Sequence, residues 1–397
     1  MRTSYIIDAI RTPIGRLGGK LSSVRPDDLL ALVIAELIKR NPQVDVNAIE
    51  DVIAGAANQA GEDNRNVARM AVLLAGLPIT IGGNTVNRLC ASGLQAVMDS
   101  ARAIMCGDGE IYIAGGVESM TRAPFVMAKN QEPWSRKVEV FDTSIGWRFV
   151  NKKLAEKFYP YNMGETAENV AKQYNISRKE QDAFAASSQQ KYFAALEAGK
   201  WQQEIVPVQI TENNELTIFK EDEHPRRTSM DKLALLKPAF IKDGTVTAGN
   251  SSGINDGAAA MLLASEEAVT RYGLKPMAKI VSMAIAGVDP SIMGMGPVPA
   301  TKKALQRAGL TINDIDLIEM NEAFASQSLA CIRELNINTD ILNVNGGSIA
   351  IGHPLGCSGV RISATLLHEM KRRNVRYGLA TMCVGVGQGA AVIYEKL

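Results

Sequence analysis

Two stretches of this chain carry the same order of sequence features about 266 residues apart, and this repeat limits the folds that the chain can adopt. Residues 47–53 (NAIEDVI) align with residues 313–319 (NDIDLIE), which lie 266 positions further on. Cys90, which precedes Ala-Ser-Gly, aligns with Cys357, which precedes Ser-Gly, at a separation of 267. The near-constant separation predicts two homologous halves, although any two α/β stretches can also align this way by chance.

Predicted helices and strands alternate in both halves, a pattern that is typical of an α/β architecture. The predicted helices cover residues 26–40, 91–106, 300–310 and 358–370, and the predicted strands cover residues 49–55, 111–116, 315–320 and 378–383. In the second helix, Leu94, Val97 and Ala101 share one apolar face, and Gly107 is expected to end the helix. Each half is therefore expected to contain a βαβ unit.

Residues 121–247 differ from both halves. They contain all three tryptophans and many basic residues, with one clear predicted helix around 164–198. The stretch that follows, GTVTAGNSSGINDGAAAMLLAS, is predicted to return to the core as a strand, a glycine-rich turn and a further apolar segment. The predicted divisions are an N-terminal half (1–120), an inserted loop subdomain (121–247), a return to the N-terminal half (248–270) and a C-terminal half (271–397).

The composition excludes several classes of partner. Forty-three basic and 42 acidic side chains give a net charge of +1, which does not favour nucleic acid or a membrane surface. Five cysteines without a CxxC pair indicate a reducing compartment and argue against a structural zinc site. The longest apolar run is interrupted by Glu36 and is too short to span a bilayer. Because the first residues resemble a strand, we expect no signal or transit peptide and a cytoplasmic location.

Cys90 lies between a predicted extended segment and a predicted helix. A helix N-terminus carries about half a positive charge and can lower a cysteine pKa from about 8.5 to between about 3.5 and 7.5. The resulting thiolate would be a nucleophile. Cys90 could instead be a small buried apolar residue. The polar neighbours Asn87, Arg88 and Ser92 favour the reactive interpretation.

A second candidate is His353, which lies in the loop GGSIAIGHPLGCSG (346–359). The flanking Gly352 and Pro354 are expected to fix the backbone while a substrate approaches the main chain. Cys383 ends a predicted strand before another glycine-rich turn, and Asn321 follows the strand at 315–320. Functional residues of open α/β sheets gather at such carboxyl ends.

A zinc site and a nucleotide-binding site both fit the sequence poorly. Cys90, His353 and Cys383 could in principle bind zinc, but they include no closely spaced ligand pair, so no metal site is predicted. The glycine-rich stretches contain neither a GxGxxG after a first strand nor a GxxxxGK[ST] motif, so nucleotide binding is not indicated.

Four blocks in order, NRLCASG, NEAF, GGSIAIGHPLGCSG and ATMCVGVGQG, resemble the signature blocks of the thiolases. DAIRTPIGRLGG near the start and GNSSGINDGAAA extend the resemblance to essentially the whole chain. The resemblance implies an α/β, thiolase-like, five-layered αβαβα fold of two homologous halves. It also implies acyltransfer between coenzyme A (CoA) thioesters with no further cofactor, in a homodimer or homotetramer.

The resemblance assigns roles block by block. Cys90 matches the nucleophile that takes the acyl group, and His353 matches the residue that activates it and helps to form an oxyanion site. Cys383 matches the cysteine that moves a proton on or off the α-carbon, and Asn321 matches the residue that holds a water beside the histidine. The backbone N–H groups of Cys90 and Gly385 match a second oxyanion hole, for the acyl-enzyme.

The resemblance also implies binding positions for the substrate. The positions that match the pantetheine tunnel or the substrate site are Ser252, Ala248, Met163, Ala323 and Phe324. Asn162 precedes Met163-Gly164 where many acetoacetyl-forming members have a histidine. The arginine expected to stack on the adenine is displaced in HPRRTS, which leaves Arg226 or Arg227 for that role.

Several segments bear on the substrate. QAGEDNRNVARMAVLLAGLP, GGVESMTRAPFVM and DTSIGWRFVN look closest to degradative thiolases, notably those that act on 3-oxoadipyl-CoA. HPLGCSG is equally at home in fatty-acid β-oxidation members. The alternatives are a biosynthetic, acetoacetyl-CoA-forming acetyltransferase, a decarboxylating condensing enzyme and a non-catalytic lipid carrier or scaffold.

Overall fold

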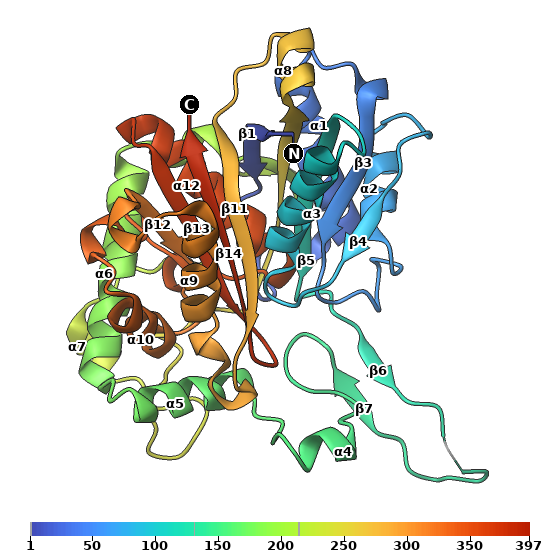
Figure 1. The fold of residues 1–397 in the computed structure, drawn as a ribbon. Helices are drawn as coiled ribbons and strands as arrows, with labels where there is room; N and C mark the ends of the chain where they lie inside the picture. Colours follow the sequence, from blue (N-terminus) through green and yellow to red (C-terminus); the bar gives the residue numbers. More distant parts are fainter. Residues whose placement is uncertain (1, 131, 213–214) are drawn as a thin grey trace.

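The molecule consists of two halves whose strands follow the same order, as the computed structural model of residues 2–130, 132–212 and 215–397 shows (Figure 1). The N-terminal half has the order β4-β3-β5-β10-β1 and the C-terminal half has the order β12-β13-β14-β11. The N-terminal strands are β1 (Ser4–Arg11), β2 (Gly15–Arg16), β3 (Ile49–Gly55), β4 (Asn84–Val86), β5 (Ile111–Ser119) and β10 (Asn255–Ser265). The C-terminal strands are β11 (Ala278–Gly287), β12 (Leu317–Met320), β13 (Tyr377–Val384) and β14 (Gln388–Lys396).

The strand directions also agree between the halves. β3 is parallel to β5, and β10 pairs antiparallel with both β5 and β1. In the same way, β12 is parallel to β13, and β14 pairs antiparallel with both β13 and β11. This correspondence is the repeat that the sequence separation predicts. The two sheets meet where Tyr5 and Ile6 of β1 pair with Lys279 and Ala278 of β11.

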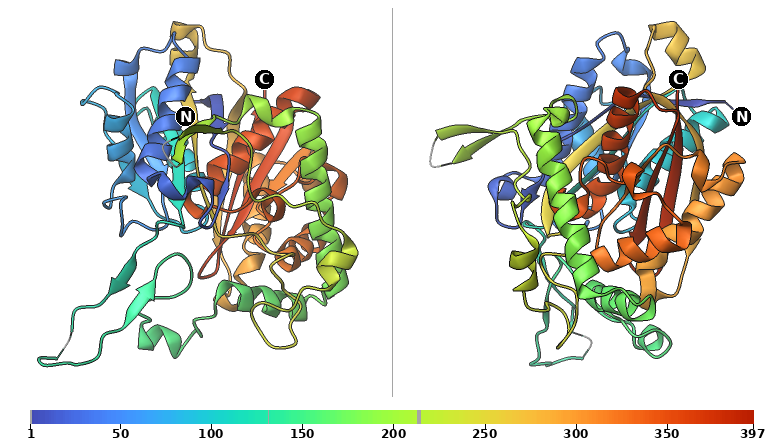
Figure 2. Two further views of the ribbon diagram at one scale, coloured as in Figure 1. Left: turned by 180° about the vertical axis from the view of Figure 1, so that it is seen from behind. Right: turned by 90° about the vertical axis from the view of Figure 1, so that its left-hand side faces the viewer.

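Helices form three layers around the two sheets (Figures 1 and 2). α1 (Pro26–Arg40) and α2 (Val67–Leu74) cover the outside of the N-terminal sheet, and α9 (Pro297–Ala308) and α10 (Ala325–Leu335) cover the outside of the C-terminal sheet. α3 (Ser92–Cys106) and α12 (Leu355–Arg373) pack against each other between the sheets. Two shorter helices, α8 (Glu266–Tyr272) and α11 (Ser348–Ile351), complete the two halves. The predicted five-layered αβαβα fold is therefore confirmed.

Two glycines allow the central helices to cross closely. A Cβ on Gly93 of α3 would lie 2.5 Å from the carbonyl oxygen of Gly356 and 3.1 Å from the nitrogen of Val360. A Cβ on Gly359 of α12 would lie 2.0 Å from the nitrogen of Leu94. Because backbone atoms occupy these positions, no side chain fits at either glycine. The crossing lies near the N-terminal ends of both helices, which follow Cys90 and His353 respectively.

The insertion (121–247) has no hydrophobic core of its own in the part of it that the structure describes. Tyr192 and Trp201 join the central core, and Val208 and Ile210 pack with the N-terminal half. Its helices are α4 (Lys152–Ala155), α5 (Met163–Gln173), α6 (Arg178–Glu197) and α7 (Met230–Ala234), and its strand pairs are β6 (Phe125–Met127) with β7 (Val140–Asp142), and β8 (Val208–Glu212) with β9 (Glu215–Phe219). Short 3-10 turns over residues 20–23, 46–48, 200–203, 290–295, 312–314 and 339–341 complete the structure.

The prediction of one helix over 164–198 is wrong, because the segment forms α5 and α6. Asn175 between them has a left-handed backbone (φ 52°), which ends the first helix. Ser177 begins the second helix through a capping box with Glu180, whose carboxylate accepts a hydrogen bond from the Ser177 N–H at 2.8 Å.

The predicted strand at GTVTA is also wrong. The N–H groups of Thr245 and Val246 donate to the carboxylate of Glu168 at 2.7 and 2.8 Å, so they are not available to a neighbouring strand. The apolar segment that follows is β10. No helix in residues 2–130, 132–212 and 215–397 is long and apolar enough to cross a membrane.

The helix crossing generates the first prediction. Gly359→Ala should lower the free energy of unfolding by about 2 kcal/mol or more, because the new methyl group would overlap the backbone of Leu94. Gly287→Ala is the matched control, since its Cβ would meet only the Gly387 oxygen at 3.8 Å. Urea denaturation followed by circular dichroism measures both variants, and equal stabilities would contradict the role given to the crossing.

Candidate active site

Cys90 lies in a tight turn between β4 and α3. The hydroxyl of Ser92 accepts a hydrogen bond from the Arg88 N–H at 2.9 Å and donates to the Leu89 carbonyl at 2.6 Å. Leu89 has φ 46°, a left-handed conformation that L-residues adopt only at a cost of about 1–2 kcal/mol. The turn thus holds Cys90 at the N-terminal end of α3 against local strain.

The surroundings of Cys90 do not ionise its thiol, contrary to the prediction from sequence. The N–H groups of Gly385 and of Cys90 itself face the sulfur and favour the thiolate. Burial is the larger effect, however, and it raises the pKa of the Cys90 thiol to about 11 although part of the residue is exposed. The resting sulfur is therefore a thiol, and a base is needed to remove its proton.

Cys383 lies next to Cys90. It is buried in β13, and its thiol pKa is raised well above the usual range by burial and by the neighbouring Cys90 sulfur. Gly385 follows two residues later, and the next residue, Val386, has φ 61°. A Cβ on Gly385 would lie 3.2 Å from the Leu89 side chain, so the strained turns before Cys90 and after Gly385 lie against each other.

His353 lies between α11 and α12, in a loop that only glycine permits. Gly352 has φ 112°, and a Cβ there would lie 2.6 Å from the side chain of Asn255. The Asn255 side chain accepts a hydrogen bond from the His353 N–H at 3.0 Å. The glycine and the asparagine together fix the backbone that carries the imidazole.

Ser358 determines the tautomer of His353. Its hydroxyl lies 2.6 Å from His353 Nδ1 and donates to the Pro354 carbonyl at 2.7 Å. A hydroxyl has one hydrogen, so Ser358 accepts at the imidazole and Nδ1 carries the proton. Nε2 is then an acceptor. Burial and the charge of Arg361 lower the pKa of His353 to about 3, so the ring is a neutral base.

Asn321 links His353 to the strand that carries Cys383. Its Nδ2 lies 3.4 Å from His353 Nδ1 and 3.3 Å from Nε2, and its backbone N–H donates to the Thr381 carbonyl of β13 at 3.0 Å. His353 and Cys90 each lie three residues before a glycine of the helix crossing, Gly356 and Gly93. Cys90, Cys383 and Gly385 thus adjoin one another, and Asn321 contacts both His353 and the strand that carries Cys383.

Several residues predicted to bind the substrate adjoin this site. Ala323 and Phe324 form a buried apolar cluster with Cys383, against which Met163 packs (Ala167, Val246, Met293, Ala323, Phe324 and Cys383, the Cys383 cluster). Ser252 donates through its N–H to the Ala323 carbonyl at 2.9 Å. Ala248 is exposed in the loop leading to Ser252.

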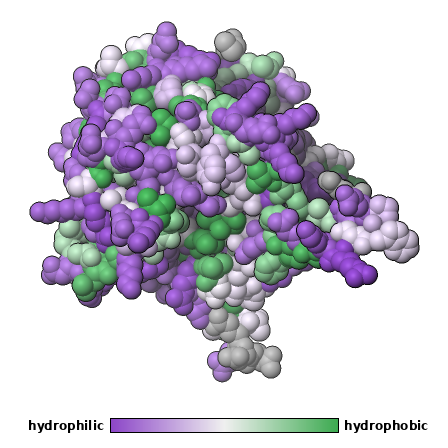
Figure 3. Space-filling model, turned by 90° about the horizontal axis from the view of Figure 1, so that it is seen from below, coloured by the Kyte–Doolittle hydropathy of each residue, from purple (hydrophilic) through white to green (hydrophobic). Residues whose placement is uncertain are grey.

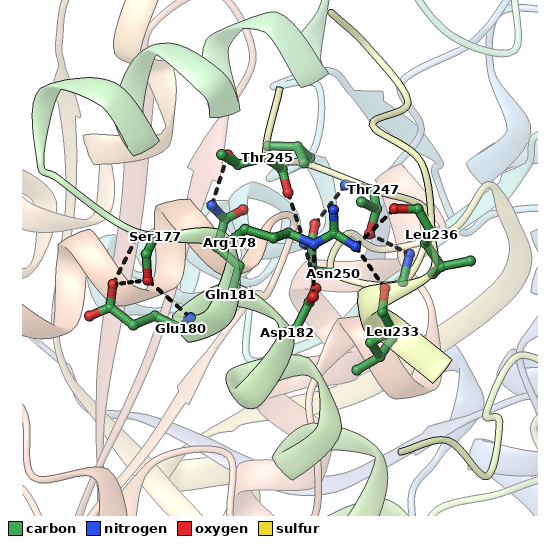
Figure 4. A network of polar contacts seen from close by, with 12 residues as sticks. Ser177, Arg178, Glu180, Gln181, Asp182, Leu233, Leu236, Thr245, Thr247 and Asn250 are labelled. Atoms are coloured by element: carbon green, nitrogen blue, oxygen red, sulfur yellow. Dashed lines mark hydrogen bonds and ion pairs between the residues drawn. The ribbon is translucent and has the colours of Figure 1, made fainter. Parts of the chain in front are cut away.

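A polar network holds this loop against α6 (Figure 4). Asn250 donates to Asp182 at 2.9 Å and to the Thr245 carbonyl at 3.1 Å. Arg178 pairs with the same aspartate at 2.7 Å and donates to the Leu233 carbonyl, also at 2.7 Å. The loop that carries Ala248 and Ser252 is therefore attached rigidly to the insertion.

Arg226 and Arg227 lie on the surface, and within the described residues no contact joins their guanidinium groups to the Cys383 cluster. Arg227 pairs with Glu197 at 3.0 Å and lies over the ring of Phe193, with 4.3 Å between the guanidinium carbon and the ring centroid. Arg226 donates through its backbone N–H to Gln189. The predicted adenine contact therefore stays a prediction.

Sequence reasoning missed the supporting residues of the site. Ser348 and Ser358 lie in the glycine-rich loop, but their positions in the sequence do not indicate that their hydroxyl groups contact Asn321 and His353. Glu118 is buried and accepts hydrogen bonds from the N–H groups of Ala57, Asn58 and Gly356. In the described part of the chain, no three His, Cys, Asp or Glu side chains are grouped so as to hold a metal ion.

The sequence and the fold both match known proteins. The models of the thiolase N-terminal and C-terminal domains match residues 4–267 and 274–396. The chain is 56% identical, over the full length of both proteins, to a 3-oxoadipyl-CoA/3-oxo-5,6-dehydrosuberyl-CoA thiolase of Escherichia coli and to a beta-ketoadipyl-CoA thiolase of Pseudomonas aeruginosa. The crystal structure of human mitochondrial 3-ketoacyl-CoA thiolase in complex with CoA has a TM-score of 0.92 and 39% identity, covering 100% of this chain and 98% of that chain.

The family models and the full-length relatives show that this protein is an acyltransferase. The chain belongs to the thiolase family. The predicted family, fold and type of activity are thereby confirmed.

The high pKa of Cys90 generates the second prediction. In a Cys106→Ser background, which removes the exposed cysteine, iodoacetamide should alkylate Cys90 about tenfold faster per pH unit up to pH 10. The thiolate fraction keeps rising below a pKa of about 11. Mass spectrometry of the alkylated peptide gives the rate, with Cys90→Ala as the control. A plateau with a midpoint below pH 8 would show that the resting thiol is already ionised.

Proposed function

We propose that this protein is a degradative thiolase that cleaves 3-oxoadipyl-CoA with CoA, giving acetyl-CoA and succinyl-CoA. The observation that carries the proposal is the 56% identity, over the whole chain, to relatives named for this substrate. Cleavage between C2 and C3 of a six-carbon 3-oxo dicarboxylic thioester leaves two carbons as acetyl-CoA and four carbons as a succinyl group. The runner-up is an acetoacetyl-CoA-forming acetyltransferase.

In the first half-reaction, Cys90 attacks the C3 carbonyl of the substrate. His353 Nε2 takes the thiol proton, which suits a neutral ring with its proton on Nδ1. The tetrahedral oxyanion lies at the N–H groups of Cys90 and Gly385. The C2–C3 bond then breaks, its electron pair forms the enolate of acetyl-CoA, and Cys383 gives its thiol proton to C2. The succinyl group remains on Cys90 as a thioester.

In the second half-reaction, CoA replaces acetyl-CoA. The Cys383 thiolate takes the proton of the CoA thiol, and the CoA sulfur attacks the succinyl carbonyl. The Cys90 sulfur leaves and recovers its proton from His353. Every proton returns to its starting group, so the reaction needs no cofactor besides the thioesters. The raised pKa of Cys383 is compatible with its role, because the thiol keeps its proton until the strongly basic enolate forms, and the thiolate left behind is itself a strong base.

The oxyanion sites supply most of the stabilisation in this scheme. One positioned donor is typically worth about 3–4 kcal/mol in a buried site. His353 and Asn321 serve the enolate oxygen, with Asn321 holding a water beside the ring. The burial of both side chains supports this assignment, because low polarity strengthens each hydrogen bond to the developing charge.

The pantetheine chain of CoA would follow the Cys383 cluster, past Met163, Ser252 and Phe324, with Ala248 at its exposed end. Arg226 or Arg227 would contact the adenine. We also propose a cytoplasmic location, which the free state of all five cysteines supports.

A homodimer or homotetramer is proposed for the assembly, on the basis of two exposed apolar regions. One is the arm that projects from the body in Figure 1 (residues 123–130 and 132–155), where Phe125 is 74% exposed. The other lies beside the edge strand β4, where Leu74 and Ile79 are exposed. Figure 3 shows that apolar side chains also lie among the hydrophilic ones on the underside of the molecule. A dimer needs one such region and a tetramer needs two.

Initial rates of thiolysis provide the third prediction. We expect kcat/KM for 3-oxoadipyl-CoA to exceed that for acetoacetyl-CoA and for 3-oxohexanoyl-CoA, which has the same chain length without the carboxylate, by about tenfold or more. Cys90→Ala is the inactive control, and intact mass spectrometry of the wild type should show one acyl group on Cys90. A preference for acetoacetyl-CoA would favour the runner-up, and an acyl adduct on intact Cys90→Ala would refute the role of Cys90.

The assembly provides the fourth prediction. Light scattering after gel filtration should give two or four times the 42.7 kDa mass of the chain. Ile79→Asp and Val140→Asp, one in each apolar region, place an uncompensated charge in a buried interface and should lower the mass. Leu397→Asp is an exposed apolar control outside both regions. A wild-type monomer would contradict the proposal.

A further inference from the structure

A buried chain of hydrogen bonds runs from α12 to the catalytic imidazole. Arg361, which is fully buried, donates through Nη2 to the hydroxyl of Ser348. Ser348 donates to Oδ1 of Asn321 at 2.6 Å, and Nδ2 of Asn321 lies 3.3 Å from His353 Nε2. Neither Ser348 nor Arg361 appears in the scheme proposed above.

Only one assignment of donors and acceptors satisfies every hydrogen bond in this chain. A guanidinium has no acceptor, so Arg361 must donate and the Ser348 oxygen must accept. The single hydroxyl hydrogen of Ser348 is then free for Asn321, where only the carbonyl oxygen can accept it. The amide of Asn321 is thereby fixed with its NH₂ group toward His353.

The opposite amide orientation lacks these partners. With Nδ2 turned to Ser348, the hydroxyl would face two donors and its own hydrogen would have no acceptor. Oδ1 would face His353, where a donor is needed for the oxygen of the thioester. Both Ser348 and Asn321 are fully buried, so water cannot replace the lost contact.

The electrostatics of Arg361 agree with this arrangement. Its Nε and Nη1 have no hydrogen-bond partner, so the bond to Ser348 is its one directed contact among the described residues. Burial lowers the pKa of His353, and the charge of Arg361 adds to that effect, so the imidazole stays neutral. The buried guanidinium of Arg361 therefore acts on both residues that are assigned to the enolate oxygen. It acts on Asn321 through Ser348, and on His353 through its charge.

We propose that Ser348 is a positioning residue for this reaction: held by Arg361, it sets the orientation in which the Asn321 amide presents its N–H donors beside His353. The inference rests on the proposed function, because it concerns the site that stabilises the enolate oxygen. It predicts that Ser348 acts on the turnover step through Asn321 and not on the binding of CoA.

A double-mutant cycle tests this proposal, with steady-state thiolysis of 3-oxoadipyl-CoA as the assay. Ser348→Ala should lower kcat about tenfold, a part of the loss expected from removing an oxyanion donor, and leave the KM for CoA within twofold. Ser348→Thr, which keeps the hydroxyl, should recover most of kcat. In an Asn321→Ala background, Ser348→Ala should change kcat less than twofold, because the group it orients is gone.

Controls separate this effect from general destabilisation. Ser282→Ala removes another buried hydroxyl, which lies in β11 and donates to the Ala304 carbonyl of α9 away from the site, and this variant should keep wild-type kcat. Should Ser348→Ala fail to fold, Ser348→Cys, with its weaker donor, should give a kcat between those of Ser348→Thr and Asn321→Ala. Thermal melting of each variant checks that the fold is intact.

Two results would overturn the inference while leaving the proposed function in place. One is a kcat for Ser348→Ala within twofold of the wild type while Asn321→Ala is slow. The other is an equal, multiplicative loss in both backgrounds, which would mean that Ser348 acts independently of Asn321. Failure of the wild type to cleave any 3-oxoacyl-CoA would instead refute the proposed function itself.

Discussion

The close crossing of α3 and α12 is the contact on which the site depends. Gly93 and Gly359 lie 266 positions apart, the separation of the repeat, and each permits the backbone of the opposite helix to approach. The turn that carries Cys90 and the loop that carries His353 precede these two helices directly. Because the helices lie between both sheets, the crossing also brings the ends of β4, β12 and β13 to one place. A duplicated unit thus produces one asymmetric site, since its two copies supply different residues at matching positions.

Many of the helices and strands could be predicted from the sequence, because the signals that mark them are local. The helix over 26–40 and the strand over 49–55 have the predicted bounds, because apolar periodicity and the proline near the helix start are local signals. The division of 164–198 was missed although Ser177 and Glu180 form a recognisable capping box, because the apolar pattern continues on both sides. The absence of a strand at GTVTA depends on Glu168, which lies 77 residues before Thr245, and no local pattern reveals such a contact.

The candidate site also has features that local sequence patterns reveal and features that depend on distant contacts. Cys90 was identifiable from its place before a predicted helix, His353 from its glycine-rich loop, and Cys383 from its place at a strand end. Their protonation states were not, because the pKa of Cys90 depends on burial by segments distant in the sequence. A helix N-terminus alone indicates a thiolate, whereas the folded chain surrounds the sulfur and keeps it protonated. Because Cys90 and His353 are both neutral at rest, the buried site holds no permanent thiolate–imidazolium pair, which would be costly to desolvate. The thiolate is needed only when a substrate carbonyl is present for it to attack.

The pairing of β1 with β11 has a mechanical consequence. It makes the two sheets one hydrogen-bonded surface from β12 to β4, and the central helices lock the same boundary from the other side. A hinge between the halves would have to break backbone hydrogen bonds and expose the core. The chain therefore has a rigid chemical centre, because the two sheets beside the central helices cannot move apart without breaking this pairing.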